Sequence, residues 1–161
     1  MYKIKIKKEK HNFSAAHFIT FENDCESLHG HNYYTSLEMT GTLDENAYLM
    51  DFRNLKKELS QICDELDHKV LLAAKNSHQK ITKNSNEYEV IFNGSRYVFP
   101  EDDVIMLPIE NTTVEKLSEY ICQRLVESLK SKGNLLNVSS IEVGVEETIG
   151  QMASFRISFE N

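Results

Sequence analysis

The 161-residue sequence has no tryptophan, only two prolines and three cysteines, and no long apolar run. A membrane helix needs about 20 consecutive apolar residues, so no membrane span is predicted. The cysteines, Cys25, Cys63 and Cys122, are odd in number and form no CxxC pair. A disulfide framework is therefore not expected. A reduced, cytoplasmic compartment is expected instead. The net charge of −7 argues against binding to nucleic acid.

The length and composition, with 40% hydrophobic and 27% charged residues, predict one globular domain over 1–161. The N-terminal residues alternate polar and apolar and predict a strand, not a signal peptide. Five lysines lie between Lys3 and Lys10. They favour a strand edge protected by charge over a binding patch. Cys63 and Cys122 lie among apolar residues at helical spacing and are predicted to belong to the core.

Hydrophobic periodicity predicts an α+β fold. Two helices are expected, one capped by Asp51 and one capped by Thr112 or Thr113, with Glu115 suited to a capping box with Thr112. The strongest turn signal is Asn93-Gly94, between two β-rich runs. Strands in sequential pairs imply an antiparallel sheet with both helices on one face. The predicted elements are strands at 2–16 and 31–43, a helix at 52–66, a loop at 75–86, a hairpin at 88–99, a helix to about 132, and strands at 137–147 and 153–160.

Three histidines form the first chemical signal. In His29-Gly30-His31, a strand would point both imidazoles to one face, and the glycine would remove bulk between them. If the strand that ends at His17 pairs with this one as a hairpin, His17 comes back beside His29. Three neutral imidazoles can hold zinc and leave a fourth position open. The alternative is a set of surface polar residues, which is how two further histidines, His11 and His78, are interpreted.

Ordered motifs then resemble the 6-pyruvoyl-tetrahydropterin synthase family, which includes the 6-carboxytetrahydropterin synthases. The matching segments are 13–17 (FSAAH), 25–33 (CESLHGHNY), 50–52 (MDF), 66–68 (LDH), 111–115 (NTTVE) and 145–148 (VEET). The resemblance implies a T-fold, an antiparallel four-stranded sheet with two helices on one side. It also implies assembly through the sheets into a homohexamer, a dimer of trimers, with active sites between subunits.

The family acts on 7,8-dihydroneopterin triphosphate, and the resemblance implies zinc at the three histidines. It places Cys25 as the general base. It places Asp67 and His68 as a second pair, in which the histidine transfers a proton and the aspartate orients it. Adjacent residues rarely touch in an extended chain, so this pair is expected to work across a helix end or between subunits.

The pterin anchor of the family matches Glu147, which directly precedes Thr148. A carboxylate there can accept hydrogen bonds from the 2-amino group and N3–H of the ring. Strand alternation should turn the neighbouring Glu146 to the other face.

Two features depart from the compact family pattern. Glu26 occupies the position of a glutamate found in a branch that cleaves the dihydroneopterin side chain, and it is either a second catalytic group or a loop carboxylate. The segment from about 74 to 108 is longer than in compact members and could cover the site or extend a subunit contact.

The Cys-x3-His-Gly-His spacing favours a 6-carboxytetrahydropterin synthase of the pathway to queuosine or archaeosine. The animal-type 6-pyruvoyl-tetrahydropterin synthases have one more residue in that interval. Three alternatives stay open: 6-pyruvoyl-tetrahydropterin synthesis, side-chain cleavage to 6-hydroxymethyl-dihydropterin, and a non-catalytic pterin- or metal-binding T-fold module.

Overall fold

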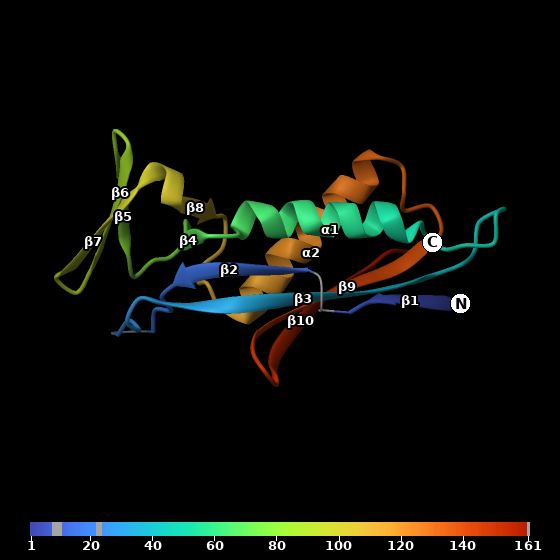
Figure 1. Ribbon diagram of the computed structural model, residues 1–161, viewed down its shortest axis with the longest axis horizontal. Helices are drawn as coiled ribbons and strands as arrows, with labels where there is room; N and C mark the ends of the chain where they lie inside the picture. Colours follow the sequence, from blue (N-terminus) through green and yellow to red (C-terminus); the bar gives the residue numbers. More distant parts are fainter. Residues whose placement is uncertain (8–10, 22–23, 161) are drawn as a thin grey trace.

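The computed structural model describes residues 1–7, 11–21 and 24–160. Parts of the predicted strand and of the lysine run, at 8–10, lie outside the described residues. Two helices, α1 (Phe52–Leu66) and α2 (Val114–Ser131), cover one face of the main sheet (Figure 1). We call the other side of this sheet the open face. The strand order in the main sheet is β10-β9-β3-β2-β4-β8, and β1 also pairs with β3. These strands are β1 (Tyr2–Ile6), β2 (Asn12–His17), β3 (His29–Gly41), β4 (Lys69–Ala73), β8 (Val104–Leu107), β9 (Val138–Thr148) and β10 (Gln151–Ser158).

The predicted antiparallel sheet forms its centre. The expected strand at 2–16 is divided into β1 and β2, and both pair antiparallel with the long β3. β9 and β10 complete the four-stranded T-fold sheet. The sequence did not predict β4 and β8, which extend the sheet through parallel pairings beside β2. The predicted antiparallel four-stranded sheet is confirmed, and these two short parallel strands extend it.

The helices begin close to where their caps predict. The Asp51 carboxylate accepts a hydrogen bond of 2.8 Å from the Arg53 amide, as expected at an N-cap. α2 is capped by Thr113, so the predicted capping box with Thr112 is wrong. The Thr112 hydroxyl instead donates to the Phe18 carbonyl. The apolar sides of both helices pack on the sheet and bury Cys63 and Cys122, which confirms these as core residues.

The segment near 74–108 contains a second, three-stranded sheet, made of β5 (Lys80–Asn84), β6 (Glu87–Phe92) and β7 (Ser95–Pro100). We call it the inserted sheet, and it stands at one end of the molecule (Figure 1). Asn93 and Gly94 both have positive φ, 45° and 82°, which confirms the predicted tight hairpin. The prediction of a loop at 75–86 is wrong at β5. This strand is polar and lacks the alternation of apolar residues that would have predicted it.

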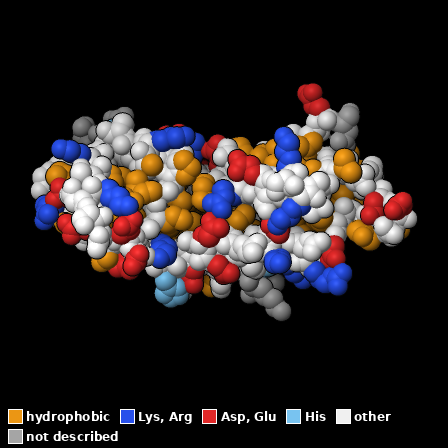
Figure 2. All heavy atoms as spheres, turned by 90° about the horizontal axis from the view of Figure 1, so that it is seen from above, with side chains coloured by type: hydrophobic (Ala, Val, Ile, Leu, Met, Phe, Trp, Pro, Cys, Tyr) orange, Lys and Arg blue, Asp and Glu red, His pale blue; other side chains and the backbone are white. Residues whose placement is uncertain are grey.

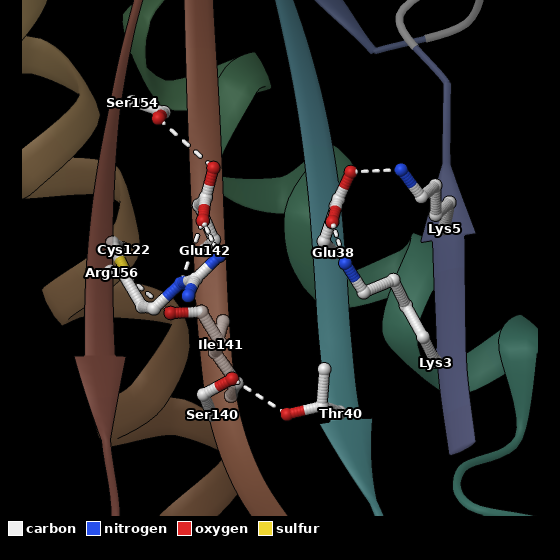
Figure 3. A network of polar contacts seen from close by, with 10 residues as sticks. All are labelled: Lys3, Lys5, Glu38, Thr40, Cys122, Ser140, Ile141, Glu142, Ser154 and Arg156. Carbon is white, nitrogen blue, oxygen red and sulfur yellow. Dashed lines mark hydrogen bonds and ion pairs between the residues drawn. The ribbon is translucent and has the colours of Figure 1, made fainter. Parts of the chain in front are cut away.

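Two surface features follow from the sequence pattern. On the open face, charged residues pair across neighbouring strands: Lys3 and Lys5 with Glu38, and Arg156 with Glu142 (Figure 3). Figure 2 shows that acidic and basic side chains are interspersed over the face that it displays. Within the described ranges, no helix is long and apolar enough to cross a membrane.

One histidine prediction is wrong. His11 is buried, with only 5% of its surface exposed, and its Nδ1 lies 3.1 Å from the Ser60 hydroxyl. It lies just before β2, where its carbonyl accepts hydrogen bonds from the amide and the hydroxyl of Thr35. His78 is exposed, as predicted.

Candidate active site

The pairing of β2 with β3 brings three histidines together. His17 lies directly opposite His29 in the antiparallel register, as the sequence predicts, and His31 follows on the same face. One ring nitrogen from each of His17, His29 and His31 lies within 4.8 Å of the others. We call these residues the histidine cluster; it lies on the face that the helices cover, and it could hold a metal ion.

Gly30 serves a different purpose from the one expected. It points to the open face, not between the imidazoles, because strand residues alternate. A Cβ atom there would lie 3.0 Å from the Ala15 carbonyl oxygen. The missing side chain therefore lets β2 approach β3 closely and keeps His17 in register with His29.

Backbone carbonyls orient two of the rings. Nδ1 of His17 donates to the Thr112 carbonyl at 3.0 Å, and Nδ1 of His29 donates to the Ser27 carbonyl at 2.7 Å. Both rings therefore keep Nε2 as the nitrogen available to a metal, which is a common arrangement around metal-bound histidine. Sequence reasoning missed these partners because a backbone carbonyl has no residue signature. The NTT motif that places Thr112 was the only signal.

Burial keeps the centre of the cluster neutral. It lowers the pKa of His17 to about 4, so this imidazole is uncharged at neutral pH and suited to ligation. The Tyr33 hydroxyl lies 3.1 Å from His17 Nε2. Burial, with the negative charges of Glu147 and Glu26, raises the pKa of Tyr33, so the hydroxyl stays protonated.

Glu147 lies close to the histidine cluster. The β3–β9 register places Tyr34 opposite Glu146, and the β9–β10 register shifts directly after Glu146, so regular alternation ends before Glu147. Besides burial, the negative charge of Glu147 raises the pKa of Tyr33, whose hydroxyl lies 3.1 Å from His17 Nε2, and this interaction places the Glu147 carboxylate near the cluster. Glu146 turns to the other face, as expected, and its carboxylate accepts a 3.2 Å hydrogen bond from the Gly150 amide. Thr148 ends β9 and is exposed.

Cys25 and Glu26 are adjacent but have different surroundings. Glu26 Oε2 lies 3.7 Å from His29 Nε2, so this carboxylate reaches the histidine cluster. Cys25 packs against an apolar group formed by Phe18, Leu72 and Val90, beside the inserted sheet. Burial raises the pKa of the Cys25 thiol, and the neighbouring Asp24 and Glu26 carboxylates raise it further.

Asp67 and His68 touch directly, contrary to the expectation for adjacent residues. His68 has a φ of 57°, and this left-handed turn after α1 brings its Nδ1 to 2.8 Å from Asp67 Oδ2. The other Asp67 oxygen accepts a 2.7 Å hydrogen bond from the Ser14 amide. The Ser14 amide and His68 hold the pKa of Asp67 below its ordinary value.

The Asp67–His68 pair belongs to the opposite side of the sheet from the histidine cluster. His68 is exposed and lines a shallow groove of about 570 Å³. On β2 and β3 this groove is lined mostly by residues that alternate with the three histidines, namely Ser14, Ala16, Gly30 and Asn32, although Ala15 and His31 also border it. The described residues therefore bring together the histidines, Glu26 and Glu147, and place the His68 ring against Asp67.

Two helices on one face of a mostly antiparallel sheet, with three convergent imidazoles and two carboxylates close to them, are the features of a T-fold enzyme. Residues 5–158 match the family model described as 6-pyruvoyl tetrahydropterin synthase, and the chain belongs to this family. Members of the family act on small pterins.

Relatives agree with this placement. A *Methanocaldococcus jannaschii* protein named as a candidate 6-carboxy-5,6,7,8-tetrahydropterin synthase is 35% identical over 89% of this chain and 88% of that protein. A *Plasmodium vivax* 6-pyruvoyltetrahydropterin synthase, solved with a catalytic glutamate changed to alanine, superposes with a TM-score of 0.92 at 28% identity over 98% of both chains. A *Pyrococcus furiosus* dihydroneopterin monophosphate aldolase is 39% identical over 37% of this chain and 50% of that protein.

Proposed function

We propose that the chain is a zinc-dependent 6-carboxy-5,6,7,8-tetrahydropterin synthase that acts on 7,8-dihydroneopterin triphosphate in the cytoplasmic pathway to queuosine or archaeosine. The observation that carries this proposal is the histidine cluster with the Glu147 carboxylate close to it. The relationship to the *Methanocaldococcus* protein supports this branch of the family.

The site residues suit each part of this substrate. The Glu147 carboxylate can accept hydrogen bonds from the pterin 2-amino group and N3–H, which fixes the ring edge in one orientation. The side chain of the substrate then extends toward the histidine cluster. A zinc ion held there supplies a Lewis acid for the side-chain oxygens. The Thr112 and Ser27 carbonyls keep the imidazoles in the tautomer that such an ion requires.

The Asp67–His68 pair completes the site only if another subunit provides it. Within its own chain, the His68 ring of this pair borders the groove on the open face, and it contacts Asp67 there. A neighbouring copy could present its pair to this chain's cluster, with Asp67 orienting the His68 ring for proton transfer. We therefore propose a homohexamer, a dimer of trimers, with active sites between subunits.

The second proton-transfer group is either Cys25 or Glu26. The family spacing favours Cys25, whereas the 3.7 Å approach to His29 Nε2 favours Glu26. This contact supports a second candidate function, cleavage of the dihydroneopterin side chain to 6-hydroxymethyl-dihydropterin. The *Plasmodium* enzyme with a catalytic glutamate and the partial match to the *Pyrococcus* aldolase are consistent with it.

A product assay tests both functions. Zinc-loaded protein is incubated with 7,8-dihydroneopterin triphosphate, and the pterin product is identified by mass. We expect 6-carboxytetrahydropterin, with release of acetaldehyde and triphosphate. A 6-hydroxymethyl or 6-pyruvoyl product would assign the corresponding alternative, and no turnover would leave a binding module.

The two candidate bases are separated by Cys25→Ala and Glu26→Gln in the same assay. We expect Cys25→Ala to lose the carboxy product, and Glu26→Gln to lose any side-chain cleavage product. If Glu26→Gln leaves every product and rate unchanged, the carboxylate has no part in the reaction.

A further inference from the structure

The inserted sheet packs against described residues of the connection between β2 and β3. We call this connection, which carries Cys25 and Glu26, the segment. Tyr97 on β7 stacks on Phe18, with ring centroids 5.3 Å apart and an interplanar angle of 27°. Phe18 is almost fully buried and directly follows His17. The inserted sheet therefore reaches the start of the segment, one residue beyond the histidine cluster.

A second set of contacts holds the other end of the segment. Tyr97 and the tip of the β6–β7 hairpin, with Asn93 and Ser95, line a small cavity of about 130 Å³ together with Cys25. Cys25 also pairs with Thr20 in an isolated β-bridge.

Thr20 is itself fixed from outside the segment. The Asn76 side chain donates to the Thr20 hydroxyl at 2.7 Å, and the Asn111 amide donates to the Thr20 carbonyl at 2.9 Å. These bonds anchor one partner of the Thr20–Cys25 bridge. The position of Cys25 is then set by that bridge and by the inserted sheet.

We propose that Tyr97 is a positioning residue, through which the inserted sheet fixes Cys25 and thereby turns Glu26 toward His29. The two neighbours point to different surroundings, so holding Cys25 against the apolar group of Phe18, Leu72 and Val90 directs the next side chain to the histidine cluster. The catalytic consequence rests on the proposed function, whereas the positioning itself does not.

Alkylation of Cys25 tests the positioning without any assay of activity. Cys25 is the one partly exposed cysteine of the three, because Cys63 and Cys122 are buried. Iodoacetamide is added to the native protein, and each site is followed by mass spectrometry. We expect Tyr97→Ala to speed labelling of Cys25 about fivefold or more, as local order is lost. Cys63 and Cys122 should stay unlabelled, which shows that the core is intact.

Two variants provide matched controls. Val98→Ala removes apolar surface from the exposed side of the same strand and should leave the rate of Cys25 labelling unchanged. Tyr97→Phe keeps the ring on Phe18 and should restore the slow rate. A wild-type labelling rate in Tyr97→Ala would overturn the proposal, and Tyr97→Leu, which also removes the aromatic ring, decides it if Tyr97→Ala does not fold.

Kinetics separate this inference from the proposed function. If wild type turns over, Tyr97→Ala should lower kcat about tenfold, because a small displacement of a catalytic group is costly. KM should stay within about twofold, because the pterin anchor Glu147 lies on β9 and keeps its binding energy. An unchanged kcat would contradict positioning of Glu26. An inactive wild type would contradict the proposed function, while the alkylation result would still decide the positioning.

Discussion

The two faces of β2 and β3 carry different chemistry, although successive residues of the same two strands alternate between them. The face toward the helices holds the histidine cluster, with Tyr33 buried beside it and His17 kept neutral. The open face holds the exposed His68, whose partner Asp67 has a lowered pKa, and rows of paired charges farther along the sheet (Figure 3). A strand period of two is enough to separate a cluster built around a buried imidazole from an exposed Asp–His pair. This separation is what the proposed sharing of active sites between subunits requires.

The most direct test of the difference between the two faces is to remove one histidine from each face. His29→Ala deletes a ligand of the proposed zinc site, so bound zinc should fall from about one ion per chain to below about 0.1 after dialysis. His68→Ala should keep full zinc, because its ring lies on the other side of the sheet. Metal content is measured by elemental analysis, with circular dichroism as the check on folding. Full zinc in His29→Ala, or lost zinc in His68→Ala, would contradict the division between the faces.

Mixing the two variants tests whether the faces meet between subunits. Each variant alone should lack pterin turnover, since each loses one half-site. Chains of His29→Ala and His68→Ala, unfolded and refolded together in equal amounts, should regain about a quarter of wild-type activity, because half of the cluster faces and half of the partner pairs are intact in a random assembly. The control mixes the two proteins without unfolding. A refolded mixture that stays inactive, while refolded wild type recovers, would contradict sites shared between subunits.

Local patterns predicted the elements that form the site. Alternation placed Tyr33, Thr35, Leu37 and Met39 on one face of β3, and all four are buried there. The same alternation fixed the face of His29 and His31, and the hairpin with β2 placed His17. Turn chemistry identified Asn93-Gly94. These features depend on neighbours in sequence or on one antiparallel register, which residue types specify directly.

Long-range and backbone partners could not be predicted in this way. β4 and β8 pair in parallel, and each is short, so neither carries a turn or an alternation that names its partner. The orientation of His17 depends on a carbonyl 95 residues away in sequence. The surroundings of Cys25 depend on Tyr97, which belongs to the inserted sheet. The motifs identified the residues that can react, but only the tertiary structure distinguishes the neighbours of Cys25 from those of Glu26.

The smallest predicted effect is a difference in stability. It separates an ion pair in the helical layer from one on the open face. Glu58 on α1 is buried and pairs with Lys132 and Ser128 at the end of α2, whereas Glu38 pairs with Lys3 and Lys5 on the open face. Glu58→Gln should lower the free energy of unfolding by about 1 kcal/mol, and Glu38→Gln by less than about 0.5 kcal/mol, because the more exposed pair is better screened by solvent. Urea unfolding at one fixed chain concentration measures both values.

The pH dependence provides the control for the Glu58 variant. Lys132 and Ser128 hold the pKa of Glu58 below its ordinary value. The ionised carboxylate therefore stabilises the folded chain above the pKa that Glu58 has when unfolded, and this contribution is lost as the pH falls through the lower, folded value. The difference in unfolding free energy between wild type and Glu58→Gln should be full at neutral pH and should shrink on acidification. A difference that stays constant down to the acid limit of folding would show that the charge of Glu58 does not stabilise the helical layer.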